Sequence, residues 1–85
     1  MVVGPLDGFG AAAGKILQVH PEWQFVVINL GWQALNIGDV LGVYRGDQLV
    51  AKVKVERIQE QVAAARILPE YRTADITVND RVAVL

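Results

Sequence analysis

Cysteine is absent from this 85-residue chain, and histidine occurs only once. Without thiolates the chain has neither a disulfide framework nor a cysteine-based zinc site. The one histidine, His20, precedes Pro21 in a predicted turn, so we expect a solvated residue there rather than a general base. Aliphatic hydroxyl groups are limited to Thr73 and Thr77, and no nucleophile is matched with a base. We therefore expect a protein that is not an enzyme, with no catalytic residue, no cofactor and no metal site.

Excess charge and long apolar runs are also missing. Eight Lys and Arg side chains stand against nine Asp and Glu, which gives a net charge of −1. This balance produces no field that attracts polyanions, so nucleic-acid binding is disfavoured. The apolar run from Phe25 to Ile28 is far shorter than the ~20 residues that a membrane span needs. We expect no membrane insertion, and no small-molecule substrate is indicated.

A turn pattern is present twice, and the rest of the chain is organised around it. Both copies read apolar, any residue, apolar, Gly or Asn, Asp, any residue, apolar, any residue, Val. The two turns are Gly38-Asp39, within residues 35–43, and Asn79-Asp80, within residues 76–84. Gly and Asn reach positive φ at the least cost, and the following Asp can accept hydrogen bonds from amides of the same turn. The repeat predicts two equivalent turns, each leading into a strand.

Asp39 and Asp80 have two interpretations. A symmetric pair of carboxylates can share a proton or hold a metal in some β-barrel enzymes. Hydrogen bonds within each turn explain the same residues without any catalytic role, and we favour this second interpretation. The sequence therefore assigns Gly38, Asp39, Asn79 and Asp80 as structural turn residues.

Alternating and β-branched residues predict three strands in each half of the chain. The expected strands are residues 14–19, 23–30 and 40–45, then 48–57, 62–68 and 81–85. In the first strand, Ile16 and Gln18 are assigned to one face, and Leu17 and Val19 to the other. Residues 57–68 also fit helical spacing. The repeat, however, requires a strand before the second turn, as residues 23–30 precede the first, so we predict an extended segment there.

Each half thus reads strand, strand, turn, strand. Six short strands in a chain of this size hide their edges best by closing on themselves. We therefore predict an all-β, six-stranded barrel, closed or partly open, with a pseudo-twofold repeat. The barrel is expected over residues 14–85, after a flexible lead-in or linker at residues 1–13, where Gly and Pro interrupt any periodicity.

This arrangement resembles the cradle-loop family of small bacterial barrels, which carry Gly-Asp turns, and the C-terminal barrel domain of flagellar assembly protein T. The resemblance rests on Phe25-Val26-Val27-Ile28, Ile37-Gly38-Asp39, Ala64-Ala65-Arg66-Ile67 and Asp80-Arg81-Val82. It spans residues 14–85 and departs from the family pattern at Asn79, where Gly is usual. The resemblance implies a non-catalytic structural or protein-interaction module within a larger bacterial assembly.

Trp23, Trp32 and Tyr44 are the candidate partner-binding residues. The two tryptophans either close the barrel as core residues or stand exposed and anchor a partner, as aromatic residues do at interface hot spots. We predict association with copies of the same chain or with another protein, through an open strand edge, a groove or an aromatic patch that includes Trp23 or Trp32. The alternative function is nucleic-acid binding by the face of Lys52 and Lys54, which is otherwise a solvated strand face.

Overall fold

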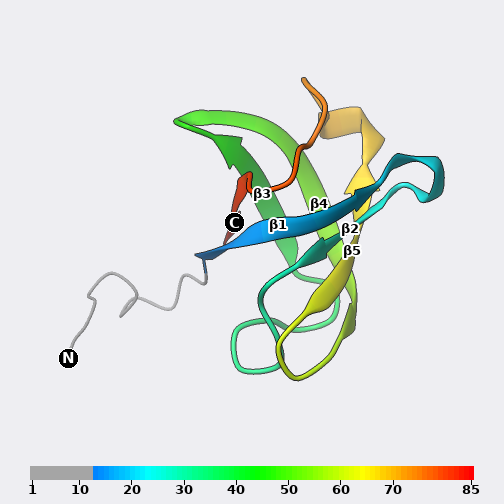
Figure 1. Cartoon of the computed structure of the whole chain (residues 1–85), viewed down its shortest axis with the longest axis vertical. Helices are drawn as coiled ribbons and strands as arrows, with labels where there is room; N and C mark the ends of the chain where they lie inside the picture. The colour runs from blue at the N-terminus through cyan, green and yellow to red at the C-terminus, as the bar shows by residue number, and fades with distance from the viewer. Residues whose placement is uncertain (1–12) are drawn as a thin grey trace.

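The computed structural model describes residues 13–85, and they form a closed six-stranded β-barrel (Figure 1). The strands are β1 (Ala13–His20), β2 (Phe25–Ile28), β3 (Val40–Arg45), β4 (Gln48–Ile58), β5 (Ala63–Leu68) and β6 (Arg81–Val84). Two short 3-10 helices, η2 (Pro21–Trp23) and η3 (Pro69–Tyr71), follow β1 and β5. The predicted all-β barrel is confirmed. Apart from Ala13, which begins β1, the predicted lead-in lies outside the described residues.

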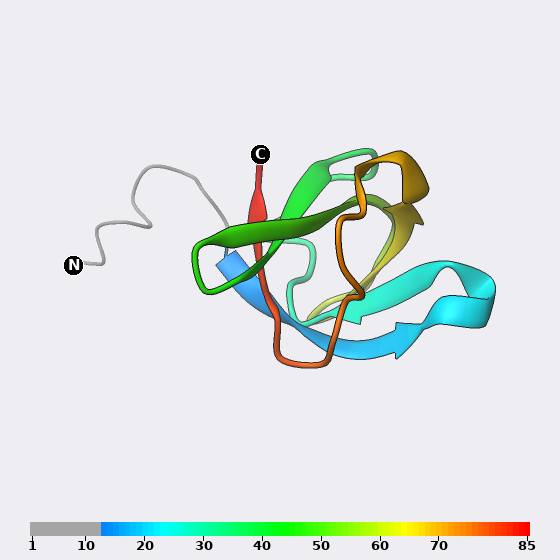
Figure 2. The ribbon, with the colours of Figure 1, turned by 90° about the horizontal axis from the view of Figure 1, so that it is seen from above.

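The strands are ordered β1-β2-β5-β4-β3-β6 around the barrel, and all six neighbouring pairs are antiparallel. Figure 2 shows the ring of strands from above. β1 closes the ring by pairing with β6 over Ala13–Lys15, while Gln18, Val19 and His20 pair with β2 alone among the described strands, so the predicted contact through an open strand edge stays a prediction. Exchanging β1, β2 and β3 with β4, β5 and β6 leaves the set of pairs unchanged, as a pseudo-twofold repeat requires. The symmetry axis itself stays a prediction.

One hydrophobic core fills the barrel. Alternate residues of β4 point into it, and Ala51, Val53 and Val55 are buried as their spacing predicts. The other core residues are Ile16, Val26, Ile28, Leu35, Leu41, Val43, Val50, Ala63, Ala65, Ile67, Ile76 and Val82. Burial of each branched side chain stabilises the fold by about 1.5–3 kcal/mol. The inward side chains therefore hold the barrel together.

The ambiguous segment is a strand. β5 pairs with β2 on one side and with β4 on the other, so its backbone groups are satisfied by sheet hydrogen bonds. Ala63, Ala65 and Ile67 are buried at every second position, a period of two rather than the 3.6 of a helix. The helical alternative for residues 57–68 is therefore wrong. No helix within residues 13–85 has the length and apolar character needed to cross a membrane.

The second strand is shorter than the predicted range of residues 23–30. Gln24 adopts φ 60°, which breaks the extended backbone between Trp23 and Phe25. Trp23 consequently belongs to η2 rather than to β2. The carbonyl of Gln24 still accepts a hydrogen bond from the amide of Ile67 at 2.8 Å, which holds this corner against β5.

The first repeated turn is fastened to β4. Gly38 has φ 94°, a conformation that favours glycine, and its amide donates to the carbonyl of Val55 at 2.8 Å. The amide of Val55 in return donates to the carbonyl of Asp39 at 2.8 Å. Oδ2 of Asp39 accepts a hydrogen bond from the amide of Asn36, also at 2.8 Å. The carboxylate thus bonds within its own turn.

The second repeated turn is fastened to β1 in the same way. Asn79 has φ 77°, and its amide donates to the carbonyl of Ile16 at 2.8 Å, while the amide of Ile16 donates to the carbonyl of Asp80 at 2.9 Å. Oδ2 of Asp80 accepts from the amide of Thr77 at 2.8 Å. The two turns therefore share one pattern of hydrogen bonds.

A bulge follows each anchoring residue. The register of β1 shifts between Ile16 and Gln18, and that of β4 shifts between Val55 and Arg57. A bulge places two consecutive residues opposite one partner, so alternation changes phase across it. Gln18 is exposed, and Val19 instead packs on the core with Ile16, so the predicted faces of the first strand are wrong. The β4 bulge leaves Arg57 exposed.

Candidate functional site

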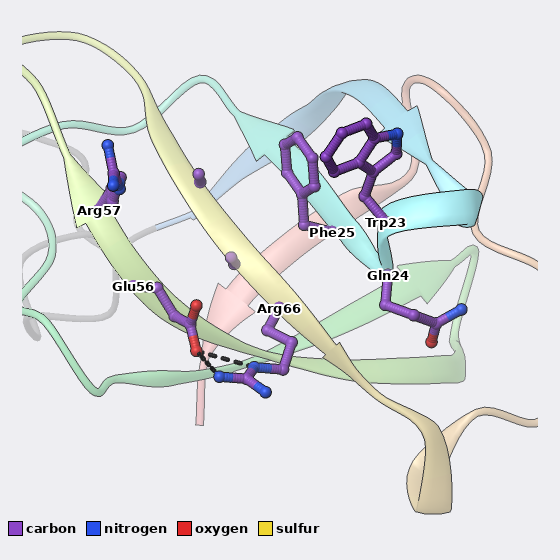
Figure 3. A pocket seen from close by; sticks show the side chains of 8 residues that line it. Trp23, Gln24, Phe25, Glu56, Arg57 and Arg66 are labelled. Carbon is purple, nitrogen blue, oxygen red and sulfur yellow. Dashed lines mark hydrogen bonds and ion pairs between the residues drawn. The ribbon is translucent and has the colours of Figure 1, made fainter.

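A groove of about 600 Å³ crosses the outer face of the barrel over β2, β5 and β4. Trp23 and Phe25 line it on the β2 side, and Glu56 and Arg57 line it on the β4 side, with β5 running between them (Figure 3). Ala64 of β5 also lines the groove, and its short side chain leaves room between the two walls. Apart from Ala65, which is buried in the core, the residues that line the groove have side chains outside the core.

Aromatic rings form the wall on the β2 side. Phe25 is half-buried, and the ring of His20 stacks on it with 4.7 Å between ring centroids and 12° between ring planes. Nε2 of His20 is also hydrogen-bonded to Oε1 of Gln18 at 2.9 Å, which orients the imidazole. The prediction that His20 is a solvated turn residue is therefore corrected: His20 ends β1, and its ring packs on Phe25. This stacking fixes Phe25 and leaves Trp23 as the exposed ring of the wall.

Charged side chains form the wall on the β4 side. Nε of Arg66 donates to Oε2 of Glu56 at 2.8 Å, and Nη2 of Arg66 donates to the same oxygen (Figure 3). Arg57, the residue that the bulge turns outward, forms no ion pair with residues 13–85. The groove therefore carries two guanidinium groups against one carboxylate, and one of the two is unpaired within the described chain.

Both tryptophans are exposed, Trp23 by 72% and Trp32 by 65%. The interpretation of these residues as core residues is therefore wrong. Trp32 lies in the loop between β2 and β3, where its indole Nε1 donates to the carbonyl of Ile58 at 3.2 Å. The indole of Trp23 forms no hydrogen bond with residues 13–85, and only Trp23 lines the groove. The two rings are thus separate features at opposite ends of β2.

Tyr44 is not part of the groove. It belongs to β3, whose neighbours in the barrel are β4 and β6. The Arg81 guanidinium lies 4.9 Å from the centre of its ring, a cation–π contact. A Cβ atom at Gly42 would come within 2.8 Å of the Tyr44 ring, so the ring covers that glycine. These contacts give Tyr44 a structural role, and the structure does not bring the three candidate aromatic residues together.

Asp80 is the buried member of a cluster of otherwise exposed side chains beside the second turn. Its two carboxylate oxygens accept hydrogen bonds from Nε of Arg45 at 3.1 Å and from Nη2 of Arg45 at 2.8 Å. The hydroxyl of Thr77 also donates to it, at 3.1 Å, and Nη2 of Arg45 reaches the carbonyl of Asp75 at 2.7 Å. This cluster ties the loop before β6 to the end of β3.

The same contacts set the ionisation of this cluster. Burial is the largest single influence and acts to raise the pKa of Asp80, but the hydrogen bonds from Arg45 and Thr77 outweigh it together, so the pKa lies below its usual 3.8. The hydrogen bond to Asp80 raises the pKa of Arg45 in turn. Asp80 is therefore held as a carboxylate. Among residues 13–85, no group of three His, Asp or Glu side chains is placed to hold a metal ion.

The basic residues of β4 lie on the same outer side as the groove. Lys54 is exposed and pairs in register with Arg66, which lines the groove. Lys52 is half-buried, and its Nζ lies 4.2 Å from the centre of the Tyr71 ring. Lys54 forms no ion pair within residues 13–85. Positive charge therefore extends from the groove along β4.

Comparisons with protein-family models, with curated proteins and with solved structures find no match for this chain. Apart from Trp23, the residues that line the groove were not candidate site residues in the sequence: Gln24, Phe25, Glu56, Arg57, Ala64, Ala65 and Arg66. Arg57 had a detectable signal, since strict alternation after Val55 would bury its charge, which is costly. A charged residue at an inward position indicates a bulge. The other groove residues carry no such signal, because they come together only when β5 pairs with β2 and β4.

Proposed function

We propose that this barrel is a non-enzymatic protein-interaction module that binds its partner in the groove over β2, β5 and β4. The observation that carries this proposal is Trp23, which is 72% exposed at a groove rather than packed in the core. Large aromatic rings and arginines are the residues that most often dominate binding energy at protein interfaces. The predicted association, with another protein or with a second copy, is thereby assigned to Trp23 rather than to Trp32.

We also propose that the chain is a cradle-loop barrel of the kind found in the C-terminal domain of flagellar assembly protein T. The closed barrel and the two turns, at Gly38-Asp39 and Asn79-Asp80, support this proposal. The resemblance favours a role as one part of a larger bacterial assembly, because such barrels are often attached to other domains.

Nucleic-acid binding is the second candidate function. It is favoured by one observation, the position of Lys54 beside Arg66 on the side of the barrel that also exposes Trp23. Single-stranded nucleic acids bind where cations and stacking rings share a surface. The net charge of −1 and the pairing of Arg66 with Glu56 weigh against it.

Photo-cross-linking in the cells that make the protein separates the two functions. The photoreactive residue p-benzoylphenylalanine is placed at position 23 in one variant and at position 32 in a matched control. We expect protease-sensitive adducts from position 23 and weaker ones from position 32. An adduct with twice the mass of the chain identifies a second copy as the partner. Nuclease-sensitive adducts support the second function, and equal yields at the two positions contradict the assignment to the groove.

A further inference from the structure

We infer that the groove binds an acidic segment of a partner protein that carries a bulky apolar side chain among its carboxylates. This inference rests on the proposed function and deepens it by naming the chemistry of the partner. It depends on three observations: the charge of the groove, its apolar wall, and the pairing of the strands beneath it.

The charge of the groove differs in sign from that of the whole chain. The chain carries a net charge of −1, whereas the lining of the groove carries Arg57 and Arg66 against Glu56. Lys54, next to Arg66 in the sheet, adds a further positive charge at the rim. A local excess of one sign on a nearly neutral protein attracts ligands of the opposite sign and orients them. The ligand is therefore anionic where it meets β4.

Arg57 provides a specific contact for this anion. It forms no ion pair with residues 13–85, while the guanidinium of Arg66 is already engaged by Glu56. A planar guanidinium binds a carboxylate through two parallel hydrogen bonds. A single carboxylate on the partner thus suffices to pair Arg57, and the Glu56–Arg66 pair stays intact beside it.

The opposite wall of the groove selects an apolar side chain. Trp23 exposes most of its indole, and Phe25 is held in place by His20. Ala64 contributes only a methyl group, so space remains between the rings and the charged wall. Burying a leucine-sized side chain against the faces of such rings stabilises a complex through apolar contact. The partner therefore presents an apolar residue next to its carboxylate.

The pairing of the strands beneath the groove determines how the segment binds. β2 and β5 are each paired with a strand on both sides, so a segment in the groove cannot add a strand to them. It must bind through side chains laid across the outer face. A polyanion such as single-stranded nucleic acid would use the same cations, but it would leave the apolar wall to base stacking and would bind with a steep salt dependence.

A designed peptide tests this inference directly. The probe is a fluorescein-labelled decapeptide in which two leucines are placed among aspartates, and its binding to residues 1–85 is followed by anisotropy. Two control peptides replace the aspartates by asparagines or the leucines by alanines. We expect saturable binding of the probe and weaker binding of both controls. Arg57→Gln should weaken the binding of the probe about threefold to tenfold, because one charge-assisted contact is lost. Lys15→Gln, which removes an equal charge from β1 outside the groove, should leave it unchanged.

The remaining outcomes overturn the inference. Equal binding of the asparagine peptide would show that the groove does not recognise carboxylates. Equal losses of affinity in Arg57→Gln and Lys15→Gln would show that only net charge matters. A ten-nucleotide oligothymidine that binds when the acidic peptide does not would assign the groove to nucleic acid. Cross-linking of a protein at position 23, together with no binding of the acidic peptide, would leave the proposed function standing and refute this inference alone.

Discussion

Two regions of the barrel use the same kinds of side chain in opposite ways. In the cluster beside β3 and β6, Arg45 is bound by Asp80, and Arg81 lies on the ring of Tyr44. In the groove over β2, β5 and β4, the charge of Arg57 and the ring of Trp23 have no such partner among residues 13–85. The comparison teaches that an aromatic or charged side chain supports the fold where it has an ion-pair or cation–π partner within the chain. A side chain without such a partner is available to another molecule.

The largest effect on stability is expected from Asp80→Ala. This change removes the acceptor for Arg45 and for both donors of Thr77, and it leaves the part-buried amide of Thr77 without its partner. The free energy of unfolding should fall by about 2–3 kcal/mol. Urea denaturation followed by circular dichroism measures this loss. An unchanged denaturation midpoint would mean that the cluster does not support the fold, and the comparison would fail on its structural side.

A smaller loss is expected from Asp39→Ala. Asp39 bonds to the amide of Asn36 as Asp80 bonds to Thr77, but no arginine binds it within residues 13–85. Loss of this one hydrogen bond should lower the free energy of unfolding by about 1 kcal/mol. The difference between the two alanine variants therefore measures what the arginine and the hydroxyl add to the second turn. Equal losses in the two variants would contradict that assignment.

Acid should reveal the same cluster with a smaller effect, because protonation removes the charge of Asp80 and leaves its side chain in place. The pKa of Asp80 is lower in the folded chain than its usual 3.8, so its contribution is complete above that pH and is lost as the pH falls through the folded value. The stability difference between the wild type and Asp80→Asn should therefore shrink between pH 7 and about pH 2. Thermal unfolding across this range gives the measurement, and a constant difference would contradict the lowered pKa.

Much of this fold follows from the sequence, because burial imposes a period of two. The range predicted for β3, residues 40–45, is the range observed, and Ala51, Val53 and Val55 of β4 are inward as their spacing requires. Short-range chemistry was also readable, since Gly38 and Asn79 both adopt the positive φ that their residue types favour. These features depend on neighbours in the sequence alone.

The groove did not follow from the sequence, because it depends on pairings between distant segments. β5 lies between β2 and β4 only after the barrel closes, and no local pattern specifies that order. Trp23 was misassigned because Gln24, at φ 60°, interrupts a run that is otherwise typical of a strand. Arg57 reaches the groove through a bulge, which shifts the alternation by one residue.

The claim that the groove serves binding and not folding is tested most directly by Trp23→Ala, with Trp32→Ala as the matched exposed tryptophan. Both the urea denaturation midpoint and the affinity for the acidic, leucine-containing decapeptide are measured on each variant. Because the Trp23 indole makes no hydrogen bond with residues 13–85, its removal should change the free energy of unfolding by less than about 0.5 kcal/mol. The same change should weaken binding of the peptide about tenfold or more, and Trp32→Ala should not. A clear loss of stability in Trp23→Ala, or peptide binding equal to that of the wild type, would contradict the account.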